Sequence, residues 1–287
     1  MNDFQPLSDL NLVIIGAGAW GKKLLNIFEL HVANCLLVSA RDFLLKPTTI
    51  DVFNQNSICW VSTSPDFQIR ILDKLIRKNT GTVILEKPYF ASSEEFYKLK
   101  HLLTNSLQIA VYLSEPWLHS ALWKDARAAI LDFHSNSEKT QILIHRFSSD
   151  RREYINPIQD WMPHDLSLIF DLKEQLEQCE LKILAEPVIK EDLMQGSFRL
   201  GKRLSVDFSI GYSTGSRTGK WLISNESKFI EVDFVGLRIE PSINVKDYQR
   251  INYTQDNPLV NQLNWITSRV SDSDIMNKLN LQKEFLY

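Results

Sequence analysis

Three glycines, Gly16, Gly18 and Gly21, follow one another as G-x-G-x-x-G near the start of the chain. Gly16 permits a tight turn out of the apolar run before it, Gly18 lets the backbone approach a pyrophosphate, and Gly21 allows a helix to pack closely on a strand. The helix that follows would direct unpaired N–H groups and the positive end of its dipole at the phosphates. The stretch predicts a dinucleotide-binding site; the alternative is a glycine turn that binds nothing.

Lys87 is a second candidate for chemistry. It stands between Glu86 and Pro88, directly after the apolar run Val83–Leu85. Pro88 keeps Lys87 out of helical geometry. We therefore expect its ammonium group at the carboxyl edge of a parallel sheet, where α/β folds bind their ligands. A solvated lysine that ends a strand is the alternative.

Asp160 and His164 form the third candidate group, and they precede an amphipathic segment from Leu166 to Leu172. Pro163 suits the first position of a helix, and Asp165 in the first turn would complement the helix dipole. We expect Asp160 in a turn and His164 at the start of the helix, converging without sharing a helix face. A histidine there can act as an acid or a base near neutral pH. The alternative is an ordinary polar residue at a helix start.

The first part of the chain alternates between strand-like and helical patterns, which predicts a doubly wound parallel sheet. Strands are expected over residues 12–15, 36–39, 58–62, 82–85 and 108–113, and helices over 67–78 and 93–103. Beyond Pro116 the expected elements are helices over 120–133 and 164–178 and strands over 140–147, 181–189, 196–212, 220–224 and 228–237. The prediction is an α/β protein: an N-terminal Rossmann domain, residues 1–116, and a C-terminal α+β domain, residues 117–287, on a mostly antiparallel open sheet.

The composition narrows the class of ligand. The chain has 287 residues, 44% hydrophobic and 23% charged, with a net charge of −3, as expected of an ordinary globular protein of about two domains. Such a charge favours neither nucleic acid nor an anionic membrane as a partner, so a small molecule is expected. The three cysteines, Cys35, Cys59 and Cys179, are far apart, and neither a disulfide framework nor a metal site is predicted. No stretch could span a bilayer and no signal peptide is evident, which predicts a cytoplasmic protein.

The order of these motifs resembles the glucose-fructose oxidoreductase and inositol dehydrogenase family, often called Gfo/Idh/MocA. The resemblance rests on GAGAWG at 16–21, the loop Val61–Pro65, the triplet EKP at 86–88 and D-x-x-x-H-D at 160–165, and it covers most of the chain. It implies an NAD(P)-dependent oxidoreductase acting on a hydroxyl or carbonyl carbon of a sugar, polyol or nucleotide-linked sugar. It also implies that the second domain carries the substrate pocket and, as a homo-oligomer, the contact between copies.

The resemblance assigns roles to individual residues. Lys87, Asp160 and His164 would form the catalytic set. His164 would exchange the hydroxyl proton, Lys87 would stabilise the charge on the oxygen, and Asp160 would orient the imidazole or bind a neighbouring hydroxyl. The residues expected to contact the cofactor are Gly16, Gly18, Ala19, Trp20, Gly21, Ser39, Arg41, Thr63, Ser64, Pro65, Glu86 and Lys87.

The residues about 20 positions past the glycines indicate which nicotinamide cofactor is preferred. NAD sites carry an acidic residue there for the ribose hydroxyls, whereas the resemblance puts Ala40 in that place, between Ser39 and Arg41. The missing carboxylate removes repulsion against a 2′-phosphate, and Arg41 could pair with it. The prediction is NADP(H) over NAD(H); the alternative is that Asp42 fills the acidic role.

The chain also departs from the family pattern. The C-terminal domain looks shortened near residues 275–287, and the stretch 156–159 lacks the glycines usual before the aspartate. The substrate is therefore left open. Arg146, Arg151 and Arg152 could clamp a carboxylate or phosphate of the substrate, although a solvated loop is the favoured interpretation.

Two other functions compete with the oxidoreductase. One is a nonenzymatic NAD(P)-binding sensor of the same fold, and the other is a redox-neutral lyase or glycosidase that uses bound NAD. The presence of Lys87, Asp160 and His164 together favours chemistry, because a sensor has no need of all three.

Overall fold

A computed structural model describes residues 7–46, 57–78, 81–105, 109–149, 157–176, 180–190, 193–213, 215–241, 250–268 and 274–286. The chain divides into two compact units. The first combines Met1–Glu115 with Leu259–Tyr287, and the second is Pro116–Pro258.

The first unit is built on a five-stranded sheet in the order β2-β1-β3-β4-β5, in which all neighbouring strands are parallel. Its strands are β1 (Asn11–Ile15), β2 (Asn34–Val38), β3 (Ser57–Val61), β4 (Thr82–Leu85) and β5 (Ala110–Leu113). The direction of winding reverses at β1, which has β2 on one side and β3 on the other. The predicted doubly wound Rossmann sheet is confirmed.

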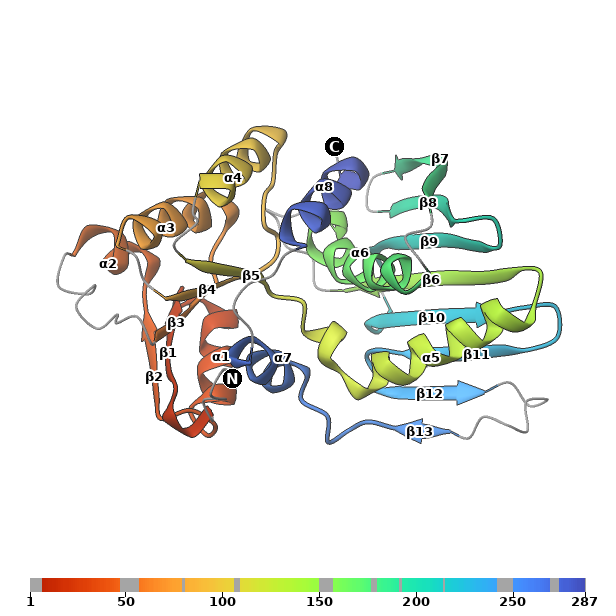
Figure 1. Cartoon of the computed structure of the whole chain (residues 1–287), viewed down its shortest axis with the longest axis horizontal. Coiled ribbons are helices and arrows are strands. Elements are labelled where there is room, and N and C mark those ends of the chain that lie inside the picture. Colours follow the sequence, from red (N-terminus) through yellow and green to blue (C-terminus); the bar gives the residue numbers. More distant parts are fainter. Residues whose placement is uncertain are drawn as a thin grey trace. The chain divides into compact units, whose positions relative to one another are not determined.

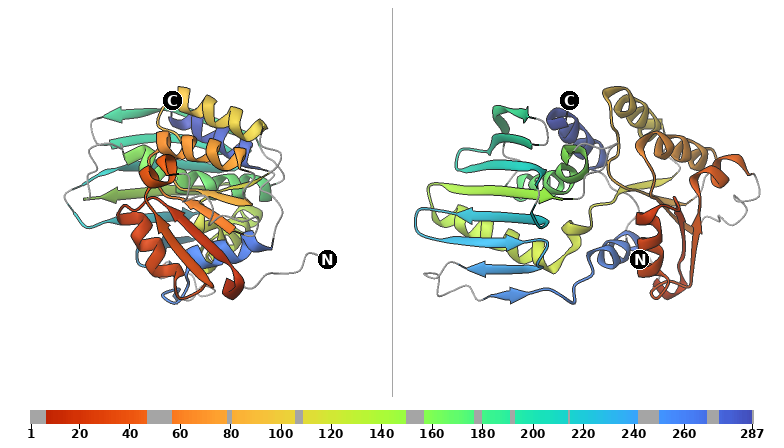
Figure 2. Two further views of the ribbon diagram at one scale, coloured as in Figure 1. Left: turned by 90° about the vertical axis from the view of Figure 1, so that its left-hand side faces the viewer. Right: turned by 180° about the vertical axis from the view of Figure 1, so that it is seen from behind.

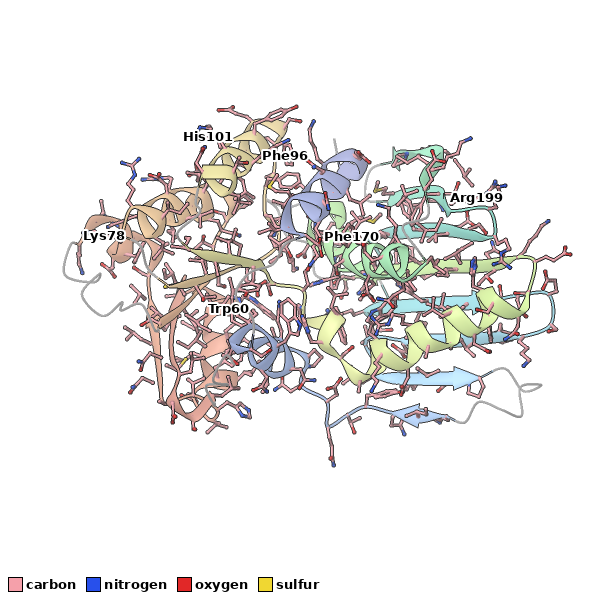
Figure 3. All side chains as sticks on the ribbon, in the orientation of Figure 1. Trp60, Lys78, Phe96, His101, Phe170 and Arg199 are labelled. Atoms are coloured by element: carbon pink, nitrogen blue, oxygen red, sulfur yellow. The ribbon has the colours of Figure 1, made fainter. Side chains whose placement is uncertain are left out.

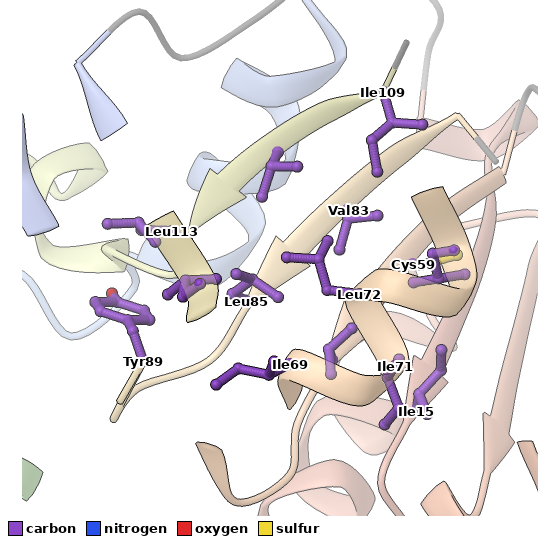
Figure 4. Close-up of a cluster of buried hydrophobic side chains, with 14 of the residues drawn as sticks. Ile15, Cys59, Ile69, Ile71, Leu72, Val83, Leu85, Tyr89, Ile109 and Leu113 are labelled. Carbon is purple, nitrogen blue, oxygen red and sulfur yellow. The ribbon is translucent and has the colours of Figure 1, made fainter. Parts of the chain in front are cut away.

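Helices cover both faces of this sheet (Figure 1). One face carries α2 (Ala40–Leu45), α3 (Pro65–Arg77), α4 (Ser93–Asn105) and α8 (Ile275–Leu286), and the other carries α1 (Ala19–Phe28) and α7 (Pro258–Thr267). A strand between two helical layers is apolar throughout, because its side chains alternate between two buried faces. In β3, Cys59 and Val61 join the first cluster, and Ile58 and Trp60 join the second. Figure 4 shows part of the first cluster, where side chains of α3 lie against the strands.

The C-terminal segment belongs to the first unit, which corrects the expected assignment of residues 259–287 to the second domain. Leu263 of α7 and Leu279 of α8 are fully buried in the two hydrophobic clusters of the first unit. The Nζ of the half-buried Lys278 lies 2.7 Å from a carboxylate oxygen of the buried Glu115, just past β5. What resembled a shortened end of the second domain is therefore the completion of the first. Nothing in the apolar spacing of a short helix says which sheet it covers.

The second unit contains an eight-stranded sheet in the order β13-β12-β11-β10-β6-β9-β8-β7. Its strands are β6 (Thr140–Ser148), β7 (Leu181–Lys190), β8 (Leu193–Leu200), β9 (Leu204–Tyr212), β10 (Thr218–Ser224), β11 (Phe229–Asp233), β12 (Arg238–Pro241) and β13 (Ile251–Asn252). All pairs are antiparallel except β6 with β9. The predicted mostly antiparallel sheet is confirmed, but the single strand expected over 196–212 is two strands, because the chain turns at Gly201 with a φ of 59°.

Two long helices, α5 (Ala121–Asn136) and α6 (Pro157–Gln175), lie on one face of this sheet (Figure 1). The rings of Trp123 on α5 and Trp221 on β10 meet edge to face, with centroids 5.4 Å apart. Seen from behind, the opposite face carries no described helix of this unit (Figure 2). Strand β6 alternates accordingly: Ile142 and Ile144 are fully buried, whereas Gln141 is exposed. The described residues thus place helices on one face of the sheet only.

Among the described residues, no helix is long and apolar enough to cross a membrane. In the same part of the chain, no group of three or more His, Cys, Asp or Glu side chains is arranged to hold a metal ion. Cys59 is fully buried, and burial raises the pKa of its thiol. Cys35 is half-buried with its pKa raised to about 11, mainly by burial, and Cys179 lies outside the described residues.

Candidate active site

The three glycines of the G-x-G-x-x-G loop differ in what their surroundings require. Gly16 has a φ of +129°, and a Cβ there would lie 2.1 Å from the carbonyl oxygen of Ser62. A Cβ on Gly21 would lie 1.8 Å from the carbonyl oxygen of Gly16. A Cβ on Gly18 would have nothing within 4 Å. The fold therefore requires Gly16 and Gly21, whereas at Gly18 it leaves open space.

The start of α1 stands directly beside that space. Gly18 is the N-cap residue of α1 and supplies no side-chain cap to the first N–H groups of the helix. Ala19 is exposed, and Trp20 is 37% exposed with the Nζ of Lys23 5.0 Å from its ring centre. Uncapped N–H groups at a helix start bind anions, so the arrangement fits a pyrophosphate.

The residues after β2 form a compact cap on α2. The amide of Asp42 donates to Oγ of Ser39 at 3.0 Å, and that hydroxyl donates to Oδ2 of Asp42 at 2.7 Å. The Nζ of Lys46 lies 2.7 Å from Oδ1 of the same carboxylate. The hydrogen bonds from Lys46 and Ser39 hold the pKa of Asp42 below its usual value. Asp42 is thus engaged locally, while Arg41 beside it is exposed.

The loop after β3 lies against the glycine loop. Thr63 contributes the side-chain atom nearest to the space beside Gly16, with its Cγ2 2.9 Å from a Cβ placed there. Ser64 is the N-cap residue of α3 and Pro65 is its first residue. The amide of Ser62 donates to the carbonyl of Ile15 at 2.8 Å, which extends the β1–β3 ladder to this point.

Lys87 and Glu86 follow β4 directly, and the Lys87–Pro88 peptide is cis. Lys87 is half-buried at the carboxyl edge of the sheet, as the sequence predicted. Glu86 is only 3% exposed. Its Oε1 accepts from Nε1 of Trp60 at 2.9 Å and from Oγ of Ser114 at 2.7 Å, which joins the ends of β3, β4 and β5. Trp60 is labelled in Figure 3. The carboxylate expected to contact the cofactor thus bonds to side chains inside the unit.

The first unit therefore gathers its candidate residues at one edge. Gly16, Ser39 and Glu86 are the first residues after β1, β2 and β4, and Thr63 is two residues past β3. The carboxyl ends of parallel strands meet at one edge of a sheet, where this fold class binds ligands.

Asp160 and His164 both lie in α6, which starts at Pro157. The expected turn followed by a helix start at His164 is wrong, and so is the expected first position for Pro163, which lies inside the helix. A spacing of four residues puts Asp160 and His164 on the same helix face. Pro163 is the seventh residue of α6, so the helix lacks the backbone N–H that would bond to the carbonyl four residues earlier. Asp160 is 2% exposed and His164 is half-buried.

Asp165 and Arg146 form a buried ion pair beneath α6. Nε of Arg146 donates to Oδ2 of Asp165 at 2.7 Å, and Nη2 donates to Oδ1 at 2.6 Å. Nε1 of Trp221 donates to the same Oδ1 at 2.9 Å. The two charged side chains are 2% and 0% exposed. A Cβ on Gly219 would lie 3.1 Å from Nη1 of Arg146, so the glycine makes room for the guanidinium.

This pair changes two interpretations. Arg146 does not offer its guanidinium to a substrate, because Asp165 holds it in bidentate geometry, and Asp165 is not a first-turn residue. Arg151 and Arg152 lie outside the described residues. The strand pattern contained the signal for Arg146, since it shares the inward spacing of Ile142 and Ile144. An inward arginine on an apolar face needs a buried anion.

Arg217 is a charged residue beside α6 that the sequence did not single out. Its guanidinium carbon lies 4.5 Å from the ring centre of Trp161, the residue after Asp160. Arg217 is exposed and immediately precedes β10. An exposed positive charge thus stands on the ring of an α6 residue that is adjacent to Asp160 in the sequence.

The chain matches no protein-family model and no curated protein sequence. Solved structures do match it over nearly its whole length. UDP-N-acetylglucosamine 3-dehydrogenase GnnA from Acidithiobacillus ferrooxidans gives a TM-score of 0.74 at 13% identity, covering 97% of this chain and 96% of that chain.

Two further structures were solved with nicotinamide cofactors. KijD10, a 3-ketoreductase from Actinomadura kijaniata in complex with NADP and TDP-benzene, gives a TM-score of 0.69 at 8% identity, covering 97% of this chain and 96% of that chain. GenD2 from gentamicin A biosynthesis, in complex with NAD, gives a TM-score of 0.68 at 11% identity, covering 98% of this chain and 93% of that chain. The chain has the fold of the Gfo/Idh/MocA oxidoreductases, as its motifs predicted.

Proposed function

We propose that this chain is an NAD(P)-dependent oxidoreductase that transfers hydride between a nicotinamide cofactor and a CH–OH carbon of a sugar-like small molecule. The observation that carries the proposal is the contrast among the three glycines. Packing requires Gly16 and Gly21, but Gly18 borders open space at an uncapped helix start. A ligand phosphate explains the absence of a side chain there, because the backbone must come close to it. The known functions of structures with this fold also support the proposal.

The cofactor is proposed to be NADP(H) in preference to NAD(H). Ala40, two residues past the end of β2, offers no carboxylate, and the Asp42 carboxylate is bonded to Ser39 and Lys46. Arg41 is exposed and would pair with a 2′-phosphate. The bound cofactor would supply the hydride acceptor, and the chain would supply the groups that bind and orient it.

The proposed catalytic set is Lys87, Asp160 and His164. His164 would take the hydroxyl proton during oxidation and return it during reduction. Lys87 would donate a hydrogen bond to the substrate oxygen and stabilise its negative charge as the carbonyl or alkoxide forms. Asp160 would orient the imidazole or bind a neighbouring hydroxyl.

The proposed substrate class is a sugar, polyol or nucleotide-linked sugar. GnnA is a dehydrogenase of a UDP-linked sugar, and KijD10 was solved with a TDP derivative. The exposed positive charge of Arg217, which stacks on the ring of Trp161 in α6, supports an anionic substrate. The face of the second sheet opposite α5 and α6 is proposed as the contact between copies in a homo-oligomer. A cytoplasmic location stays a prediction from the sequence.

The test begins with NADPH and NADH titrations of the purified protein, followed by NADP(H)-linked turnover assays. The probes are UDP-N-acetylglucosamine, TDP-glucose, glucose and myo-inositol. The proposal expects tight binding of a reduced dinucleotide and turnover that depends on one probe class. Binding without any turnover across a broad panel of alcohols and ketones would favour the sensor. Turnover of substrate without net change in the cofactor would indicate a redox-neutral lyase or glycosidase.

A further inference from the structure

Gln68 occupies the first turn of α3 and is 1% exposed. Its Nε2 lies within hydrogen-bond distance of three backbone carbonyl oxygens. These belong to Thr63 at 2.9 Å, Glu86 at 2.6 Å and Pro88 at 3.2 Å. One side-chain amide therefore joins the loop after β3 to the turn after β4.

The orientation of this amide follows from its neighbours. All three contacts are carbonyl oxygens, which can only accept, so the nitrogen must face them. The other end of the amide, Oε1, is buried and accepts no hydrogen bond from the described residues. A buried oxygen without a donor is unfavourable, and a methionine would fill similar space without that penalty. The donors of Gln68 are thus the feature that distinguishes it from an apolar packing residue.

The two joined segments are the ones that the nicotinamide half of a dinucleotide would meet. In a doubly wound sheet the adenosine ribose lies at the end of β2 and the pyrophosphate at the start of α1. Because β3 and β4 lie on the other side of β1, the rest of the cofactor must extend over their ends. Thr63 stands on that path, and the carbonyls of Glu86 and Pro88 bracket Lys87.

We propose that Gln68 is a positioning residue. It fixes the position of the loop at Thr63, which would face the nicotinamide, relative to the backbone of Lys87. The inference rests on the proposed function, because it assumes that a dinucleotide binds along this edge. Gln68 touches neither substrate nor cofactor in this role. It acts through the backbone carbonyls that share its two N–H donors.

The test compares wild type with Gln68→Met, which keeps the length of the side chain and removes its donors. Ile71→Val, a change to a fully buried residue of the same helix, is the matched control for a general loss of packing. The measurements are the dissociation constants of NADPH and of 2′,5′-ADP, which lacks the nicotinamide half. We expect Gln68→Met to weaken NADPH binding by about tenfold or more and 2′,5′-ADP binding by less than about twofold. Ile71→Val should change neither by more than about twofold. If wild type binds NADH more tightly than NADPH, the two ligands to be compared are NADH and ADP.

Amide hydrogen exchange of the unliganded protein gives a second measurement. In Gln68→Met we expect faster exchange over residues 62–64 and 86–89 and unchanged exchange over α4. Equal weakening of the dinucleotide and its fragment would overturn the inference and leave Gln68 with a purely structural role. Unchanged NADPH binding, or unchanged exchange in both segments, would also overturn it. If wild type binds neither dinucleotide, the proposed function fails, which is a different result from a variant that binds like wild type.

Discussion

The two units hold their candidate residues by different physical means. In the first unit, Lys87 follows a strand end that is fixed by several neutral donors: Trp60 and Ser114 on the Glu86 side chain, and Gln68 on the neighbouring carbonyls. In the second unit, His164 lies on helix α6, whose Asp165 forms a fully buried ion pair with Arg146. The first arrangement distributes its stabilisation over many contacts. The second includes two buried opposite charges, so loss of either one leaves the other buried and uncompensated.

The largest expected effect is one that both units share. We expect Lys87→Met and His164→Asn each to slow hydride transfer by about 10²- to 10⁴-fold, because each removes acid–base or electrostatic catalysis. Both variants should fold and bind NADPH within about threefold of wild type, since neither change touches the glycine loop. Asp160→Asn should be milder, because an isosteric amide keeps part of the orientation. Turnover assays and cofactor titrations measure these effects. Near-wild-type turnover in Lys87→Met would contradict the proposed catalytic role and favour the nonenzymatic NAD(P)-binding sensor.

Arg146→Met should destabilise the second unit by about 3–5 kcal/mol, because Asp165 would remain buried without its partner. Urea unfolding followed by tryptophan fluorescence measures this, with Trp221 beside the pair. The control is Arg127→Met, which removes a partly exposed partner of Asp171 in the same helix α6. It should cost less than about 1 kcal/mol.

A second change sharpens the prediction for the ion pair. Adding Asp165→Leu to Arg146→Met should recover much of the lost stability, because no isolated charge would stay buried. If the double variant is no more stable than the single one, the cost arises from packing rather than from the unpaired carboxylate.

Arg41→Ala tests the first unit alone. We expect about tenfold weaker binding of NADPH, because a charge-assisted hydrogen bond to the 2′-phosphate is lost. NADH binding should stay within about twofold, since NADH carries no such phosphate. Tighter binding of NADH than of NADPH by wild type would contradict the proposed preference. It would favour the alternative that Asp42 fills the acidic role at the ribose hydroxyls.

Ser114→Ala should have a small effect, about 1 kcal/mol on the unfolding of the first unit. It removes one donor to Glu86 and leaves the Trp60 donor in place. Comparison with Arg146→Met in the same urea titration tests the contrast between several neutral donors and a buried ion pair. A Ser114 variant as unstable as the Arg146 variant would show that the two units do not differ in this way.

The sequence determined the local features of this protein. Two patterns locate strand ends to within a few residues: three glycines after an apolar run, and Lys87 between another apolar run and Pro88. They do so because turn residues and the spacing of apolar residues reflect local structure. The order of such segments predicted both sheets. It did not predict the start of α6, since Pro163 suits the first helical position but lies six residues inside the helix, which starts at another proline, Pro157.

Only the tertiary structure decided which buried polar groups meet. Arg146 and Asp165 lie on a strand and a helix that the fold brings together, and Gln68 reaches carbonyls of residues 86 and 88 from another part of the chain. The placement of α7 and α8 on the first sheet is of the same kind. The spacing of apolar residues shows that one face of an element is buried. Which other element covers that face depends on how distant segments of the chain are connected and packed.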